Sequence, residues 1–304
     1  MTTHTYATRP SYARDLTRWQ YFWLYKRHRF LNAVGLITLQ LALTAFLITF
    51  LVPTLWMVVS AFKSSTEIFM QPIVWIPKEP HLRNFTEAFR ILPLTRFAWN
   101  TFFVVAMAVT GTLISSAMVG YSFARLRWPG RDFFFALMIG TVMLPGVVML
   151  IPRFLIFRSL GWIDTLAPLI VPFWLGGSPF YIFLMRQFLR GLPYDLDEAA
   201  IIDGASHFQI FSRILLPLCK PVIATITVFS VLEHYNSFLE PLIYLNRMSL
   251  WTLALGIRAF NDSYAARWEL IFSASTVMLI PVVVLFIFAQ RYFVQGIAMT
   301  GLKG

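Results

Sequence analysis

The sequence predicts an all-α membrane protein that crosses the bilayer six times, and three observations lead to this prediction. Of the 304 residues, 58% are hydrophobic and only 13% are charged, whereas a soluble domain is normally about 25% charged. Six separate apolar stretches are each long enough for a bilayer core of about 30 Å. A helix satisfies its own backbone hydrogen bonds in lipid, so we expect each stretch to be helical.

Residues 1–30 form a basic, aromatic segment ahead of the first apolar stretch. Its cations are Arg9, Arg14, Arg18, Lys26, Arg27 and Arg29, and aromatic residues such as Trp19 and Trp23 lie among them. Such a patch can bind nucleic acid, but beside a membrane span it fits the headgroup region of the inner leaflet better. We therefore expect an interfacial segment and no nucleic-acid partner. The apolar run that follows is too long for a cleavable signal peptide.

The six expected spans follow in chain order. They are Leu31–Phe62, Ala98–Phe123, Phe133–Phe157, Leu166–Leu184, Pro221–Leu245 and Leu270–Ala289. The first is longer than a perpendicular span requires, so we expect it to tilt or to protrude. Prolines in the third and fourth spans, such as Pro145 and Pro172, predict bends that act as hinges or as static kinks. Residues 291–304 then form a C-terminal tail.

The distribution of basic residues predicts cytoplasmic N- and C-termini. With the N-terminus inside, the inner segments hold more of the 25 Lys and Arg residues than the outer segments do, which follows the positive-inside rule. Residues 63–99 and 246–268 then lie outside, and residues 186–220 lie inside. The net charge of +11 fits cations at helix ends that face anionic lipid.

The inner loop, residues 186–220, is polar but has the pattern of an ordered structure. Acidic residues fill the first turn of an expected helix, where the helix dipole favours negative charge. They are Asp195, Asp197 and Glu198. Gly204 predicts the end of that helix, because glycine tolerates the left-handed conformation. Ser206 and Gln209 have capping-box spacing, so we expect a second short helix to begin there.

Polar residues in the fifth span mark a candidate substrate pathway, because such residues are costly in lipid. Glu233, Asn236 and Glu240 are spaced i, i+3 and i+7, which places them on one face of a continuous helix. Tyr235 adds an aromatic ring beside them. Carboxylates, an amide and an aromatic ring together can bind a sugar. The same polar face can instead hold a neighbouring helix, and both interpretations stay open.

The sequence offers little for enzymatic chemistry. Cys219 is the single cysteine, so neither an internal disulfide nor a thiolate metal site is possible. The five histidines are scattered without metal-ligand spacing. No Gly-x-x-x-x-Gly-Lys-Ser/Thr sequence is present to hold ATP phosphates. We therefore expect no catalytic residue, no metal and no cofactor bound by this chain.

The inner loop resembles the EAA loop of permease subunits in binding-protein-dependent ATP-binding-cassette (ABC) importers. The resemblance rests on Glu198, Ala199, Ala200, Asp203, Gly204, Ala205 and Pro217. Ser60–Phe69, Asn84–Phe89 and Gln290–Gly304 resemble the carbohydrate branch of the family and, within it, the maltose-permease G-type subunits. The family usually shows Trp-Asn where this chain has Tyr235-Asn236, which weakens any inference about the particular sugar.

This resemblance implies the type I ABC importer permease fold for residues 31–290, in the plasma membrane of a prokaryote. The implied partners are a homologous second permease, two ABC ATPase subunits that use ATP and Mg, and an extracytoplasmic substrate-binding protein. In this family the EAA loop forms a coupling helix that sits in a groove of the ATPase. In the maltose-type subunits the C-terminal tail, here with Gly301 and Lys303, also touches the ATPases.

The function we expect is that of a permease subunit in an ATP-driven importer for a sugar, oligosaccharide or sugar derivative. The alternative is a proton-driven secondary transporter in which Glu233 and His234 relay protons. Such a transporter needs no ATPase, and an uncoupler abolishes its uptake. A membrane enzyme acting on a lipid-linked sugar would need a metal-binding acid cluster, which the sequence lacks.

Overall fold

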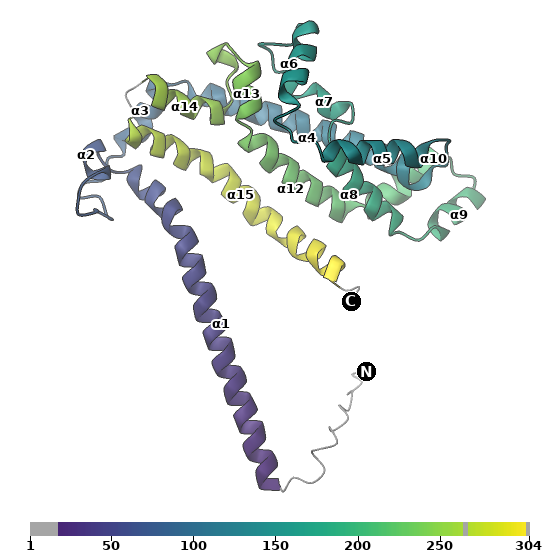
Figure 1. Cartoon of the computed structure of the whole chain (residues 1–304), viewed down its shortest axis with the longest axis horizontal. Helices are drawn as coiled ribbons and strands as arrows, with labels where there is room; N and C mark the ends of the chain where they lie inside the picture. The colour runs from purple at the N-terminus through teal and green to yellow at the C-terminus, as the bar shows by residue number, and fades with distance from the viewer. Residues whose placement is uncertain (1–17, 264–266, 302–304) are drawn as a thin grey trace. The chain divides into compact units, whose positions relative to one another are not determined.

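The computed structural model describes the backbone of residues 18–263 and 267–301 and the side chains of residues 34–260 and 267–288. All regular secondary structure in these ranges is helical (Figure 1). The predicted all-α class is therefore confirmed. The chain divides into two compact units, with the boundary between Met57 and Val58.

The first unit contains, in its described part, most of α1 (Arg18–Ser60). The 43 residues of α1 give a length of about 64 Å, so the first helix is overlong as expected. Within it Val34–Ser60 is long and apolar enough to cross a membrane, and side chains from Val34 to Leu55 are exposed. A helix that is apolar all round suits a membrane interior or a protein partner.

The central helix of the second unit is α4 (Leu94–Arg125) (Figure 1). It packs against α7 (Val171–Trp174), α8 (Pro179–Arg190) and α12 (Lys220–Asn236). Small buried residues lie along α4: Gly111, Thr112, Ser115, Ser116 and Gly120. Small residues let helices in a membrane approach closely, and a Cβ atom at Gly111 would collide with the indole of Trp174.

The last long helix, α15 (Trp268–Gly301), packs against α12 and against three shorter helices. These are α2 (Ser65–Ile68), α3 (Arg83–Ile91) and α14 (Leu253–Ser263). The expected second, fourth and sixth spans correspond to α4, to residues Ala167–Arg190 and to the part of α15 at Trp268–Phe288. All three are long and apolar enough to cross a membrane.

Polar contacts order the segment around residues 61–87 and join it to the start of α15. The amide of Asn84 donates to the carbonyls of Ala61 and Lys63 at 3.0 and 2.8 Å. Arg267 forms ion pairs with Glu87 at 2.7 Å and with Glu269 at 2.9 Å. The hydrogen bond from Arg267 holds the pKa of the Glu87 carboxyl below its usual range.

The expected third span is not one continuous helix, in line with the bend that Pro145 predicts there. It consists of α5 (Arg131–Val142) and α6 (Leu150–Ser159), separated by a turn. Pro145 accounts for the break, because its ring clashes with the carbonyl four residues earlier and it has no N–H to donate. The clash would fall at residue 141, next to the observed end of α5.

The expected fifth span is also interrupted. Helix α12 ends at Asn236, and α13 (Leu239–Tyr244) follows it. Pro241 lies four residues after Ser237, so a continuous helix would be disrupted at the position of the break. Three short segments lead into α12: α10 (His207–Gln209), η3 (Ile210–Leu215) and α11 (Leu216–Leu218). Their path bends by 75° where α12 begins.

Two further short segments complete the described part of the chain. They are η2 (Ala167–Leu169), which precedes α7, and η4 (Met248–Leu250), which precedes α14. By length and composition, four of the described helices can cross a membrane, or five if the bent pair that ends in α12 is one span.

Candidate coupling loop and translocation cavity

The inner loop forms the two short helices that its sequence predicts. Helix α9 (Asp195–Ile202) has its acidic residues in the first turn. Gly204 follows its end with a φ of 80°, in the left-handed region that favours glycine. A reciprocal capping box between Ser206 and Gln209 then opens α10.

Most residues that resemble the EAA loop are exposed. Glu198, Ala199, Asp203, Gly204 and Pro217 are exposed, Ala205 is half-buried and Ala200 is buried. Large apolar side chains are exposed among them: Leu196, Ile201, Ile202 and Phe208. Ile202 is 85% exposed. An apolar patch beside acidic residues is typical of a surface that another protein covers.

The Arg125 clamp joins α9 to the end of α4. The Arg125 side chain is 2% exposed and lies 3.6 Å from the carboxylate of Asp197. Its guanidinium donates a 2.9 Å hydrogen bond to the carbonyl of Leu192 and lies 4.2 Å from the ring centroid of Tyr194. The Tyr194 hydroxyl donates to the carbonyl of Ala124 at 3.1 Å. These contacts attach the start of α9 to the end of α4.

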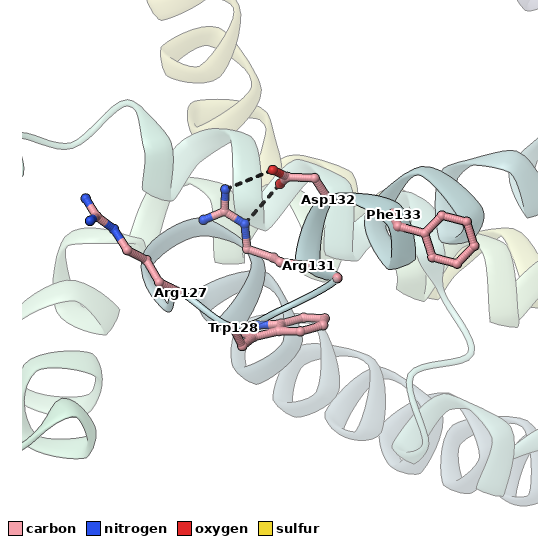
Figure 2. Close-up of a pocket in the computed structure, with 6 residues that line it drawn as sticks. Arg127, Trp128, Arg131, Asp132 and Phe133 are labelled. Carbon is pink, nitrogen blue, oxygen red and sulfur yellow. Dashed lines mark hydrogen bonds and ion pairs between the residues drawn. The ribbon is translucent and has the colours of Figure 1, made fainter.

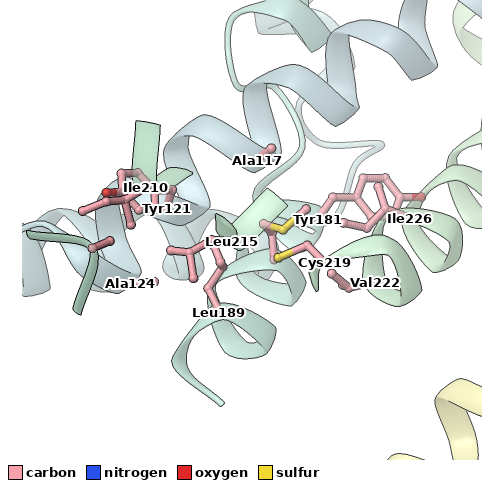
Figure 3. Close-up of a cluster of buried hydrophobic side chains, with 12 residues drawn as sticks. Ala117, Tyr121, Ala124, Tyr181, Leu189, Ile210, Leu215, Cys219, Val222 and Ile226 are labelled. Atoms are coloured by element: carbon pink, nitrogen blue, oxygen red, sulfur yellow. The ribbon is translucent and has the colours of Figure 1, made fainter. Parts of the chain in front are cut away.

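A shared core of buried side chains joins the loop to three longer helices (Figure 3). Helix α4 contributes Ala117, Tyr121 and Ala124; α8 contributes Tyr181, Met185 and Leu189; α12 contributes Val222 and Ile226; the loop contributes Ala200, Ile210, Leu215 and Cys219. Protein interiors are close-packed and transmit strain. The loop, the end of α4, α8 and the start of α12 therefore pack around one continuous core.

A cavity of ≈ 710 Å³ lies between the turn from α5 to α6, α6, α7, the start of α8, and the junction of α12 with α13. Its size is within the range of about 300–1,000 Å³ that is usual for ligand pockets. Glu233 and Glu240 line this cavity, whereas Tyr235 and Asn236 do not. The structure thus divides the four residues of the candidate pathway into two pairs.

The helix break explains the division. Because α12 ends at Asn236 and Glu240 lies on α13, the expected single helical face of Glu233, Asn236 and Glu240 is wrong. Tyr235 is 4% exposed and its hydroxyl donates to the carbonyl of Met278 on α15 at 2.8 Å. Asn236 is exposed and its amide donates to its own helix, at the carbonyl of Leu232. Tyr235 thus joins two helices.

Residues from other helices complete the polar lining of the cavity. The Tyr181 hydroxyl donates to Glu233 Oε2 at 2.7 Å. Arg153 on α6 lies 3.2 Å from Glu240. His234 and Tyr244 also line the cavity and are 8% and 1% exposed. Sequence reasoning did not assign Arg153, Tyr181 or Tyr244 to a site, because only the tertiary fold brings them to the glutamates.

A second, open cavity of ≈ 340 Å³ lies at the connection between α4 and α5, and Arg127 is among its lining residues (Figure 2). Arg131 donates to both carboxylate oxygens of Asp132, at 3.0 and 3.3 Å. The Trp128 indole donates to the Ser122 hydroxyl at 3.1 Å. These bonds order the connection and leave it with a net positive charge, which suits an anionic headgroup region.

The C-terminal tail is only partly described by the structure. Gly301 is the last residue of α15, and Lys303 lies outside the described residues. Among the residues that the structure describes, no group of three or more His, Cys, Asp or Glu side chains is placed to hold a metal ion.

Comparison with known proteins identifies the family. Residues 116–299 match the family model described as the binding-protein-dependent transport system inner membrane component. The arabinooligosaccharides transport system permease protein AraQ of Halalkalibacterium halodurans is 33% identical over 273 residues, which cover 88% of this chain and 96% of that protein. The sulfoquinovosyl glycerol transport system permease protein SmoH of Agrobacterium fabrum is 30% identical, with coverages of 87% and 93%.

A solved structure shares the fold. It is the bacterial ABC transporter involved in the import of the acidic polysaccharide alginate. The similarity has a TM-score of 0.76 at 22% identity and covers 86% of this chain and 97% of that chain. The type I ABC importer permease fold that the sequence predicted is therefore confirmed.

The protein is a multi-pass membrane permease of a prokaryotic importer. More specifically, the chain belongs to the family of binding-protein-dependent transport system inner membrane components. The predicted membership of the ABC importer permeases, which rested on the EAA-like loop, is confirmed.

Proposed function

We propose that this chain is the translocation subunit of an ATP-driven importer for a sugar, oligosaccharide or sugar derivative. The relatives named for arabinooligosaccharides and for sulfoquinovosyl glycerol support a carbohydrate substrate. The complex contains a homologous second permease, two ABC ATPases and an extracytoplasmic binding protein. ATP and Mg act in the ATPases. This chain supplies the pathway and the part that the ATPases move.

The observation that carries the proposal is the exposed acidic helix α9, fixed to α4 by the Arg125 clamp. In the proposed mechanism the ATPase groove holds the exposed residues from Glu198 to Gly204, together with Ala205 and the exposed Pro217. Closure of the ATPases moves α9, and the shared core carries that movement into α4, α8 and α12. Gly301 and Lys303, at the end of the chain, add a second contact with the ATPases.

The substrate then passes the cavity that Glu233 and Glu240 line. Carboxylates accept hydrogen bonds from sugar hydroxyls. Tyr235, which the sequence also suggested for this pathway, binds α15, and Asn236 is not among the residues that line the cavity. We therefore assign Tyr235 to the packing of α12 on α15 and Asn236 to the surface.

The coupling proposal is tested by Glu198→Lys and Gly204→Asp in the complete complex, reconstituted in liposomes. Both positions are exposed, so Glu198→Lys should fold and insert normally. Nothing lies within 4 Å of a Cβ built at Gly204, but the positive φ of 80° strains any side chain there, so Gly204→Asp also carries a local backbone cost. We expect uptake to fall at least about tenfold, which corresponds to about 1.4 kcal/mol. The measurement is labelled-sugar uptake per ATP hydrolysed.

The matched control is Glu79→Lys, a charge reversal at an exposed residue outside the inner loop, which should retain wild-type uptake. Full uptake by the Glu198→Lys and Gly204→Asp complexes would exclude α9 as the coupling helix. The proton-driven alternative, with Glu233 and His234 as a relay, is tested in the same liposomes. It requires uptake that an uncoupler abolishes and that needs no ATPase.

A further inference from the structure

We propose that the 710 Å³ cavity is a binding subsite for the hydroxyl-rich ring of a neutral sugar, so that this subunit binds the substrate directly. The inference rests on the proposed importer function and specifies its substrate class. It assigns ring recognition to Tyr244, to which the sequence gave no role, and to His234, which the sequence suggested only as a proton relay.

Two buried polar atoms in the cavity lining have no partner. His234 Nε2 and the Tyr244 hydroxyl oxygen form no hydrogen bond with any residue that the structure describes, and both side chains line the cavity. They are 92% and 99% buried, since 8% and 1% of their surfaces are exposed. Buried polar groups in proteins are almost always hydrogen-bonded. Both atoms have almost no accessible surface of their own, so a hydroxyl-bearing ligand reaches them when the cavity wall shifts, and it then supplies the hydrogen bonds that the described residues leave unmade.

Packing fixes the direction of both side chains. The His234 ring lies edge-to-face with Phe173, with ring centroids 4.3 Å apart. The Tyr244 ring packs edge-to-face on Phe157 at 5.3 Å. Rings held in this way lose little conformational freedom when a ligand binds, which favours binding. The same phenylalanines line the cavity and provide the apolar wall that ligand pockets usually have.

The charges in the cavity select a neutral ligand. Glu233 is bound by the neutral Tyr181 hydroxyl, and Glu240 is paired with Arg153. The single arginine therefore faces two carboxylates. A phosphate or sulfonate would be placed near like charge, which disfavours binding, whereas sugar hydroxyls both donate to carboxylates and accept from Arg153.

The test uses the complete transporter complex trapped with ATP and vanadate in detergent. Retention of three labelled probes is measured at equilibrium: arabinotriose, N,N′-diacetylchitobiose and sn-glycerol 3-phosphate. We expect the wild-type complex to retain a neutral sugar more tightly than the phosphate ester. Tyr244→Phe and His234→Ala should each weaken that retention by about 2- to 10-fold, which is the effect of one lost hydrogen bond. Glu233→Gln should lower the ratio of neutral-sugar retention to phosphate-ester retention, because it removes one negative charge from the cavity.

The control is Tyr235→Phe, which removes a hydroxyl that faces α15 rather than the cavity and should leave retention unchanged. ATPase stimulation by the binding protein is recorded in every variant, because it reports importer function separately. Without such stimulation in the wild-type complex the importer function itself fails. If stimulation is present, two results overturn the subsite proposal. One is that Tyr244→Phe and His234→Ala retain the sugar as tightly as the wild-type complex does. The other is that the wild-type complex retains only the phosphate ester, or no neutral probe.

Discussion

At the scale of single residues, Asp164 shows how one carboxylate fixes two loops. Its backbone has a positive φ of 61°. One carboxylate oxygen accepts from the backbone N–H groups of Asn246 and Arg247 at 3.0 and 2.8 Å, and the other accepts from the Arg247 guanidinium at 2.6 Å. These bonds join the loop after α6 to the loop after α13, and they hold α13 beside the cavity.

A pH dependence follows from these bonds. The backbone hydrogen bond from Arg247 contributes most to holding the pKa of Asp164 below its ordinary value. Because the pKa of Asp164 is lower in the folded state, its ionised form stabilises the fold at pH values above the pKa of Asp in an unfolded chain, about 3.9. This stabilisation is lost as the pH falls from there through the pKa of the folded state. We expect Asp164→Asn, which tolerates the same backbone conformation, to lose that part of the acid sensitivity. The measurement is thermal unfolding of the purified complex between pH 7 and pH 3.

An equal acid response in the wild-type and Asp164→Asn proteins would contradict this assignment. Asp164→Asn should also lower the stability at pH 7, because the charged bonds to Arg247 are weakened.

At the scale of elements, the Arg125 clamp determines how α9 is attached to α4. Both charged side chains are largely buried, at 2% exposed for Arg125 and 13% for Asp197. Removing one member of a buried pair leaves the other charge without compensation, which commonly costs about 3–5 kcal/mol. We expect Arg125→Ala to destabilise the attachment by up to about this amount. The ratio of sugar transported to ATP hydrolysed should fall, while membrane insertion persists.

The exchange variant, Arg125→Asp with Asp197→Arg, separates the charge pair from the other contacts. It restores opposite charges but loses the hydrogen bond to Leu192 and the stacking on Tyr194. Partial recovery of the transport ratio is therefore expected. If Arg125→Ala transports with the wild-type ratio, the clamp does not transmit the movement of α9.

At the scale of the whole molecule, the predicted orientation can be tested with engineered cysteines. The native Cys219 is 1% exposed, so it should react little with a maleimide that cannot cross membranes. Ile76→Cys replaces a residue that is 81% exposed in the expected outer loop, and Arg127→Cys lies in an expected inner connection. We expect Ile76→Cys to be labelled in intact spheroplasts and Arg127→Cys only after lysis. Labelling of both before lysis would exclude this orientation.

Local patterns in the sequence predicted the inner loop well. Three features were predicted: the acidic first turn of α9, the left-handed Gly204, and the capping box of Ser206 with Gln209. Each depends only on residues within about four positions of itself. Interactions of such short range depend little on the rest of the fold, so the structure reproduces them. Hydrophobic length likewise predicted α1, α4 and α15.

The cavity could not be predicted in the same way. Its polar contacts join residues that are far apart in the chain, such as Arg153 with Glu240 and Tyr181 with Glu233. Pro145 predicted the bend between α5 and α6. Pro241 was not recognised as a break, because hydropathy alone treats the region of α12 and α13 as one span. Once Pro241 ends α12, helical periodicity no longer relates Glu233 to Glu240.

The shared core has a consequence for building hybrid transporters. Because Ala200 and Ile210 of the loop share one buried cluster with Ala124 of α4 and Leu189 of α8, transplanting the loop alone from another permease would pair it with foreign helix surfaces. A graft that includes the inner ends of α4 and α8 preserves those surfaces. The unit to exchange is therefore the loop together with the parts of α4, α8 and α12 that share its core, and the cut points belong in α4 and α12 beyond Ala117 and Ile226.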